Sequence, residues 1–576
     1  MKVIYQNKIL FIILTLSIFF RIYLGELTGA WFPSDQAYDD ALLINYALYN
    51  NYTSPDHLTL LKTMGYPWFL KIVSFTGLDY TIFLSLIWSF SSLLILKLVY
   101  VISSNKLISY FFFIYILFMP TAFEIWAGTR LYRNSILAPF TIIVFYYITI
   151  QIVYFYKSSI DSIKKRFLFF ISSIFLGVFF TFTYYIKEDG VWLLACLLAS
   201  ILLSISLSIV NLFKTPSSER KGELINVGIL FVPLIIFNIG TNMYKSFNLE
   251  KVGVAEIETR TQGELGLFVR NIYKIASYNR NGINWAPADA IDKAYNVSKT
   301  FQQYPELRNK IIHTPWFSND AYQDPIRGDF LTWVLRTALT ESGTWKTEKQ
   351  VNDLFYNINR ELDEAFSNNS LEKEKNRIQI VSSMGGRSWE EIRKIMPLVG
   401  KIYRGNILLK GYSAGSQPAG NTKDLEIAKK AAELTGISYL TDYSKMNNGI
   451  VNNNKANDII ENIFKIYKLV NIFLFILSIS ILIYVPLFCI LNTQLLKERF
   501  HQYKDSIAYA FAELGFLLLS FIYSVAIAWF SEFIFLDGVN MTILNFYSVI
   551  NSVLLAFFYI FGLITFCKLY TLRKLK

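Results

Sequence analysis

The chain has 576 residues, of which 53% are hydrophobic and only 17% are charged, and its mean hydropathy is +0.36. Soluble domains carry about 25% charged residues, so this composition excludes a water-soluble globular protein and predicts a polytopic α-helical membrane protein. The formal net charge of +12 is explained by Lys and Arg in the short loops between apolar segments, which argues against a nucleic-acid partner. Cys196, Cys489 and Cys567 lie in apolar runs, which excludes a disulfide-stapled secreted domain.

Apolar segments long enough to cross a bilayer recur along the chain. A span needs about 20 mostly apolar residues. About ten segments qualify, at 8–25, 81–104, 107–126, 136–156, 168–186, 190–213, 225–241, 466–491, 507–535 and 542–567. We expect the first span to remain in the mature chain, because no small-residue cleavage site follows it and Arg21 lies near its far end.

The loop charges predict the orientation of these spans. Lys and Arg of the short loops fall mostly on the side of the N-terminus, as at Lys164, Lys165 and Arg166. The positive-inside rule therefore predicts a cell-membrane protein with both termini in the cytoplasm. The predicted domains are a seven-span module over 1–241 with a first outer loop at 26–80, an extracytoplasmic domain over 242–465, and three further spans over 466–576.

The sequence pattern of the large outer segment predicts a mainly helical domain. Apolar residues recur at helical spacing over 328–340 and 346–366, and a further helix is expected from 424 to 434, just before Gly436. Within this topology, the polar residues of chemical interest gather on the outer side of the membrane.

Three carboxylates, Asp35, Asp39 and Asp40, follow directly after the first span. A carboxylate at the membrane surface can take the proton of a sugar hydroxyl and so act as a general base. We expect Asp35 to be this base, with Asp40 and then Asp39 as the alternatives. The competing interpretation is that Asp35 caps a helix whose first turn carries the other two. The spacing allows a divalent metal here but does not require one.

Basic side chains lie on the other short outer loops. The stretch 124–134 carries Arg130, Tyr132 and Arg133, and the next outer loop reads Lys187-Glu188-Asp189-Gly190. Arg and Lys beside an apolar surface suit a lipid phosphate, although snorkelling anchors of the membrane interface have the same appearance. The predicted phosphate-binding residues are Arg130, Arg133 and Lys187, and the predicted substrate contacts are Gln36, Tyr38, Tyr132, Glu188 and Asp189.

These motifs resemble those of the GT-C superfamily of polyprenyl-phosphate-sugar-dependent glycosyltransferases, which includes protein O-mannosyltransferases and the lipid A aminoarabinose transferase. The counterparts of its acidic pair, tyrosine and Pro-Gly-Tyr-Pro-like element are Asp35-Gln36, Tyr38 and Met64-Gly65-Tyr66-Pro67. Lys187–Gly190 resembles the charged outer turn of that group. The resemblance covers roughly the first 240 residues, and Gln36 and Met64 depart from the pattern. It implies a GT-C-like bundle.

The resemblance implies transfer of a sugar from a polyprenyl-phosphate donor, with inversion, to an extracytoplasmic acceptor such as a cell-wall polysaccharide, teichoic acid, glycolipid or protein. A cell-surface polysaccharide polymerase or ligase is the nearest alternative. A transporter is a third hypothesis, which predicts ionisable residues deep in the membrane. The main such residues are Lys97 and Glu513, and both are expected to snorkel towards the cytoplasmic side.

Overall fold

The computed structural model describes residues 8–32, 39–49, 56–158, 160, 162–214, 220–314, 326–415, 425–437, 454–535 and 538–574. In this part of the chain, nine helices are long and apolar enough to cross a membrane. The protein is therefore a multi-pass helical membrane protein, as its composition predicts. The nine candidate spans are α2 (Lys8–Thr28), α5 (Tyr80–Ser103), α7 (Arg133–Tyr156), α8 (Ile163–Tyr184), α9 (Val191–Lys214), α10 with α11 (Arg220–Ile229 and Val232–Val252), α21 (Asn454–Leu491), α22 (Thr493–Ser531) and α24 (Val549–Lys574).

The third expected span, 107–126, is not a full span. Its helix, α6 (Lys106–Leu117), has only 12 residues, and a short 3-10 turn at Pro120–Ala122 follows it. Proline disfavours helical backbone in the residue before it, so the helix ends before Pro120. At 1.5 Å per residue, α6 covers about 18 Å of a hydrocarbon layer that is about 30 Å thick.

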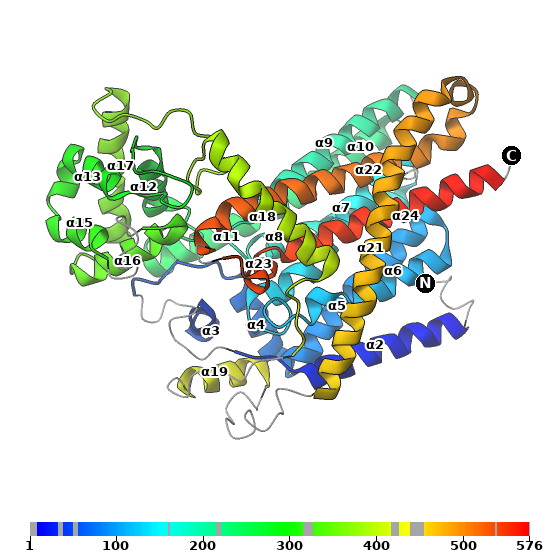
Figure 1. The fold of residues 1–576 in the computed structure, drawn as a ribbon, viewed down its shortest axis with the longest axis horizontal. Coiled ribbons are helices and arrows are strands. Elements are labelled where there is room, and N and C mark those ends of the chain that lie inside the picture. Colours follow the sequence, from blue (N-terminus) through cyan, green and yellow to red (C-terminus); the bar gives the residue numbers. More distant parts are fainter. Residues whose placement is uncertain are drawn as a thin grey trace.

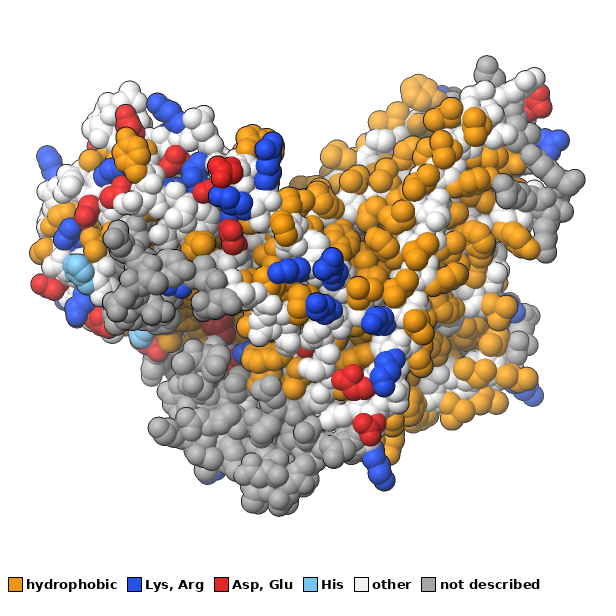
Figure 2. Space-filling model, in the orientation of Figure 1, with side chains coloured by type: hydrophobic (Ala, Val, Ile, Leu, Met, Phe, Trp, Pro, Cys, Tyr) orange, Lys and Arg blue, Asp and Glu red, His pale blue; other side chains and the backbone are white. Residues whose placement is uncertain are grey.

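The bundle is built around α7, which packs against α5, α8, α9 and α24 and is buried along most of its length. By contrast, α2 lies at the edge, where Ile9, Leu16 and Phe19 are 62–70% exposed. Hydrophobic side chains cover most of the face of the bundle in Figure 2. Such a surface is stable only against lipid, since large exposed apolar areas are unfavourable in water.

The segment between the seventh and eighth expected spans is helical in the described residues. Its helices are α12 (Gly263–Lys274), α13 (Ala288–Val297), α14 (Lys299–Gln302), α15 (Pro305–Ile312), η3 (Gly328–Phe330), α16 (Leu331–Glu341), α17 (Glu348–Ser367), α18 (Trp389–Leu408) and α19 (Leu425–Thr435). The helices predicted over 328–340, 346–366 and 424–434 correspond to η3 with α16, α17 and α19. The membrane helices α11 and α21 extend past the expected limits of 242 and 465, reaching Val252 and starting at Asn454.

Helices α12–α17 gather at one end of the bundle, whereas α2 starts and α24 ends at the opposite end (Figure 1). We call the first of these the domain end. Two helices of the same segment lie against the bundle itself. Helix α18 packs on α21, α22 and α23 (Met541–Tyr547), and α19 packs on α3 (Asp39–Tyr49) and α4 (Gly65–Thr76).

Glu513 departs from the expected snorkelling. Lys97 is exposed on α5, but Glu513 lies within α22 and is completely buried. The neighbouring helix α24 makes room for it at Gly562, where a Cβ would lie 2.5 Å from Glu513 Oε1 and 2.1 Å from the Ser478 hydroxyl oxygen. The expectation fails because the side chain points into the bundle, which a sequence pattern alone does not reveal.

Candidate functional site

The loop between α2 and α4 carries two of the predicted acids at the domain end. Helix α3 begins at Asp39, so Asp39 and Asp40 occupy its first turn, where negative charge is favourable. This is the position that the capping interpretation predicts for them. The other residues predicted in this loop, Asp35, Gln36 and Tyr38, lie outside the described residues.

A backbone bridge joins this loop to the connection before α7. The Trp31 N–H donates to Thr129 O at 3.0 Å, and the Leu131 N–H donates to Trp31 O at 2.9 Å. The Trp31 indole also donates to Ile125 O at 2.6 Å. These bonds place Arg130 beside the start of α3, although about 90 residues separate the two segments in sequence.

The Gly-Tyr-Pro element joins the first loop to the loop after α8. The Gly65 N–H donates to Tyr185 O at 2.9 Å, and a Cβ at position 65 would lie 2.2 Å from that oxygen. Only glycine permits such a close approach. This contact explains why glycine occupies position 65. It also brings Lys62 and Thr63 next to Glu188.

Asp39 is the partly accessible acid of the site. Its Oδ2 accepts hydrogen bonds from Lys62 Nζ at 2.8 Å and from the Tyr132 hydroxyl at 3.0 Å, and Arg133 Nη2 lies 3.8 Å away. The side chain remains 27% exposed. Asp39 is thus held in place by Lys62 and Tyr132 and is still partly exposed.

Asp40, in contrast, is completely buried. Both of its carboxylate oxygens accept hydrogen bonds from Arg130, one from Nε at 2.8 Å and one from Nη2. The Arg130 guanidinium also lies 4.9 Å from the Trp126 ring centre and 5.1 Å from that of Tyr132. Of the two acids, Asp39 is therefore the accessible one and Asp40 the one sealed within an ion pair.

Arg133 and Glu188 form the next pair. Arg133 Nη1 donates to both Glu188 oxygens at 2.7 and 2.8 Å. Glu188 also lies 3.9 Å from Arg260, which is paired with Asp329. Together these contacts define what we call the ion-pair cluster. Its acids are Asp39, Asp40, Glu188 and Asp329, and its bases are Lys62, Arg130, Arg133 and Arg260.

The cluster contains residues that sequence reasoning did not select. Lys62 lies two residues before the Met64-Gly65-Tyr66-Pro67 element, and the sequence pattern indicates no role for it. Arg260 and Asp329 come from the domain, where nothing in their sequence context distinguishes them from ordinary surface charges. The sequence pattern predicts that an acid-rich loop and basic loops lie on the same side of the membrane. That prediction identifies candidate residues in the loops of the bundle but none in the domain.

The basic partners keep the accessible acid ionised. Burial alone raises the pKa of Asp39, but the charges of Lys62 and Arg133 outweigh it and lower the pKa to about 2. Burial likewise opposes ionisation of Glu188, yet Arg133 and Lys62 hold its pKa well below the usual range. Both groups are therefore carboxylates at neutral pH and act as hydrogen-bond acceptors.

The three predicted phosphate-binding residues have carboxylates beside them. Arg130 and Arg133 are 6% and 3% exposed and are paired as described above. Lys187 Nζ lies 3.9 Å from Asp189, with 14% of the Lys187 side chain exposed. In this arrangement the two arginines hold the acids in position, and Lys187 is the most accessible of the three.

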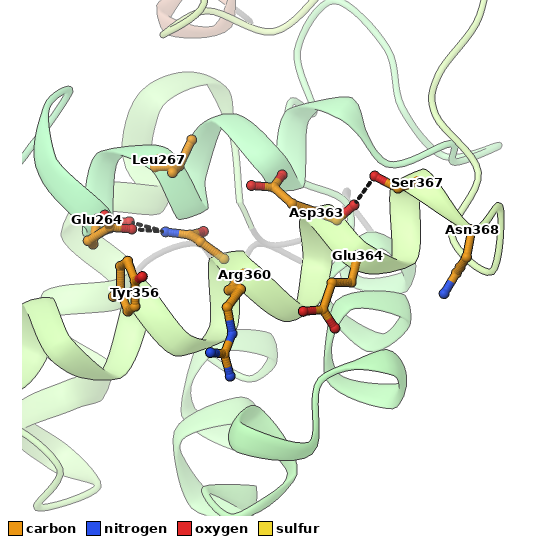
Figure 3. Close-up of a pocket in the computed structure, with 9 residues that line it drawn as sticks. Glu264, Leu267, Tyr356, Arg360, Asp363, Glu364, Ser367 and Asn368 are labelled. Carbon is orange, nitrogen blue, oxygen red and sulfur yellow. Dashed lines mark hydrogen bonds between the residues drawn. The ribbon is translucent and has the colours of Figure 1, made fainter.

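The described residues contain no group of three or more His, Cys, Asp and Glu side chains arranged to hold a metal ion. A separate open groove lies on the domain, between α12 and α17 (Figure 3). Tyr356, which is 53% exposed, stands in it with Glu264, Arg360 and Asp363. None of the residues of the ion-pair cluster lines this groove.

No protein-family model, curated protein or solved structure matches the chain significantly.

Proposed function

We propose that the protein is a membrane glycosyltransferase of the GT-C type, which transfers a sugar from a polyprenyl-phosphate donor to an acceptor hydroxyl. The observation that carries the proposal is the convergence of the first-loop acids with Lys62 of the same loop and with basic residues from two other segments, Arg130 with Arg133 and Arg260, at one end of a multi-pass bundle. Asp39 supports it further, because it is a carboxylate held by Lys62 and Tyr132 and still 27% exposed.

In this reaction the acceptor hydroxyl attacks the anomeric carbon of the donor sugar. The bond from that carbon to the phosphate oxygen breaks, and the lipid phosphate leaves with the electron pair. The hydroxyl proton passes to a carboxylate, for which the candidates are Asp39 and Asp35. A carboxylate as well stabilised as Asp39 is a weak base, so it takes the proton late, once the forming bond has made the hydroxyl acidic.

The test uses the full-length protein reconstituted in lipid and supplied with undecaprenyl-phosphate-linked sugars. Asp39→Asn is expected to lower turnover by about 10²–10⁴-fold while the protein stays folded. Asp353→Asn, an exposed acid of α17, is the matched control and should leave turnover unchanged. Full activity in Asp39→Asn would transfer the role to Asp35.

The same assay separates the alternative function. A polymerase or ligase would lengthen or transfer a preformed lipid-linked oligosaccharide instead of transferring a single sugar.

A transporter remains the second candidate because of Glu513. A fully buried carboxyl within a span is a feature of proton and ion pathways, and the described residues give Glu513 no ion-pair partner. A transporter predicts that Glu513→Gln abolishes proton-coupled uptake in vesicles. Glycosyl transfer predicts no such uptake in the unmodified protein.

A further inference from the structure

Five basic side chains lie together where the end of helix α18 packs on α21. We call them the interface cations: Lys401, Arg404, Lys410, Lys465 and Lys468. All are exposed except Lys401, which is partly buried. Within the described part of the chain, none of them forms an ion pair with a carboxylate. They differ in this from the basic residues of the ion-pair cluster, which all have carboxylate partners.

Contacts between the end of α18 and α21 place these residues side by side. Asn471 Nδ2 donates to Asn406 O at 3.3 Å, and the ring centres of Tyr412 and Phe464 lie 5.9 Å apart. On α21 these two contacts bracket two of the interface cations, and on the segment of α18 they bracket a third. Lys and Arg side chains accordingly gather over α18 and α21 in Figure 2, beside the hydrophobic face of the bundle.

The interface cations border a surface that faces lipid. Lys465 shares a face of α21 with Leu469 and Ile476, which lie about one and three turns further along and are 69% and 60% exposed. Apolar side chains this exposed are stable against hydrocarbon and not against water. Arg404 is likewise on the outer side of α18, opposite the completely buried Ile402. The interface cations therefore lie at the level where lipid head groups begin.

The acids that precede Lys465 on α21 leave this surface positive. Glu461 is one turn away, but its Oε1 accepts a hydrogen bond from the Ala414 N–H at 3.0 Å instead of pairing with a cation. Asp458 lies two turns away, at about the distance over which physiological salt screens a charge. Five cations thus face these two acids, and the surface attracts negative charge.

A surface of this kind distinguishes lipids by charge. Zwitterionic head groups carry no net charge, whereas each Lys or Arg near an anionic lipid surface strengthens the attraction by about five-fold. We propose that the interface cations bind the head groups of anionic phospholipids in the leaflet at the domain end. This inference goes beyond glycosyl transfer, because it depends only on the exposed surface of α18 and α21.

The test measures lipid binding to the purified full-length protein in neutral detergent by native mass spectrometry. Phosphatidylglycerol is expected to bind at least ten-fold more tightly than phosphatidylcholine of equal chain length, and this preference should shrink at high salt. The triple variant Arg404→Gln with Lys465→Gln and Lys468→Gln should lose most of the preference.

A second triple variant controls for the change in net charge. Lys299→Gln with Lys373→Gln and Lys375→Gln removes three exposed cations of the domain and should keep the preference. Both triple variants should melt at the temperature of the unmodified protein, since exposed substitutions rarely alter stability. Equal affinity of the unmodified protein for the two lipids, or an unchanged preference in the first triple variant, would overturn the proposal. Competition by soluble polyphosphate at equal phosphate concentration would also overturn it, by assigning the surface to an acidic polymer.

Discussion

The hydroxyl of Tyr132 joins Arg133 to Asp39. It accepts a hydrogen bond from Arg133 Nη2 at 2.7 Å and donates one to Asp39 Oδ2 at 3.0 Å. Because Arg133 is also held by Glu188 through two bonds, the orientation of the accessible carboxylate depends on a chain of four side chains. The loop after α8 is in this way coupled to the first turn of α3.

Tyr132→Phe breaks this chain and tests its role in positioning. The change removes one hydrogen bond from Asp39 and leaves Arg133 paired with Glu188, so the fold should be retained with a loss of about 1 kcal/mol. Turnover should fall by about ten-fold or more, with donor affinity unchanged, because Asp39 loses its orientation. Tyr278→Phe, on a fully exposed side chain, is the control, and equal turnover in both variants would contradict the prediction.

The Asp40–Arg130 pair should be structural. Arg130→Ala leaves the completely buried Asp40 without its partner, and breaking such a pair costs about 3–5 kcal/mol. We expect a marked fall in melting temperature in detergent. Replacing both residues, as in Asp40→Leu with Arg130→Met, should recover most of the loss, because no buried charge is then left unpaired. A double variant no more stable than Arg130→Ala alone would contradict this reading.

Asp35 is tested directly by Asp35→Asn. Asparagine caps helices as well as aspartate does, so a capping role predicts unchanged turnover and stability. A role as the base predicts a fall of about 10²–10⁴-fold in turnover with donor binding retained. The same assay on Asp39→Asn decides between the two carboxylates, since only the variant of the true base should lose turnover to this extent.

Glu348 should make the domain sensitive to pH. This acid begins α17, is 4% exposed and lies 3.4 Å from Arg336, and burial raises its pKa to about 7 despite that partner. The folded state thus favours the protonated form, so stability is greatest below the unfolded pKa and is lost as pH rises towards 7. The loss should be about 2–3 kcal/mol.

Melting curves at pH 5 and pH 8 measure this effect. Glu348→Gln should largely remove the difference between the two curves, because the amide does not ionise. Glu364→Gln, an exposed acid of the same helix, serves as the control and should keep the difference. A Glu348→Gln variant with the same pH dependence as the unmodified protein would exclude Glu348 as the cause.

The sequence predicted the fold well where local patterns decide it. Apolar length identified the long spans, and helical spacing identified α16 and α17. It failed at 107–126, where the apolar run continues but Pro120 ends the helix. The burial of Glu513 was also missed, since the direction of a side chain on a helix that is apolar all round depends on its neighbours.

For the candidate site, the sequence predicted that these loops share one side of the membrane but did not pair their side chains. Asp39, Asp40 and Arg130 were selected by type and topology, yet their pairing depends on the Trp31 bridge between segments distant in sequence. Lys62 and Arg260 were missed because a charge in a loop has no local signal for its partner. Long-range contacts of this kind are set by the packing of the whole bundle.

The short helix α6 leaves a long connection that the rest of the bundle must enclose. Between Leu117 and Tyr132 the regular structure is limited to the 3-10 turn Pro120–Ala122. Nearly all of these residues are buried in protein, the condition under which such backbone is tolerated at membrane depth. One extra helical turn in α6 would add about 5.4 Å and displace this connection. The length of α6 therefore sets where Arg130, at the end of the connection, can meet Asp40.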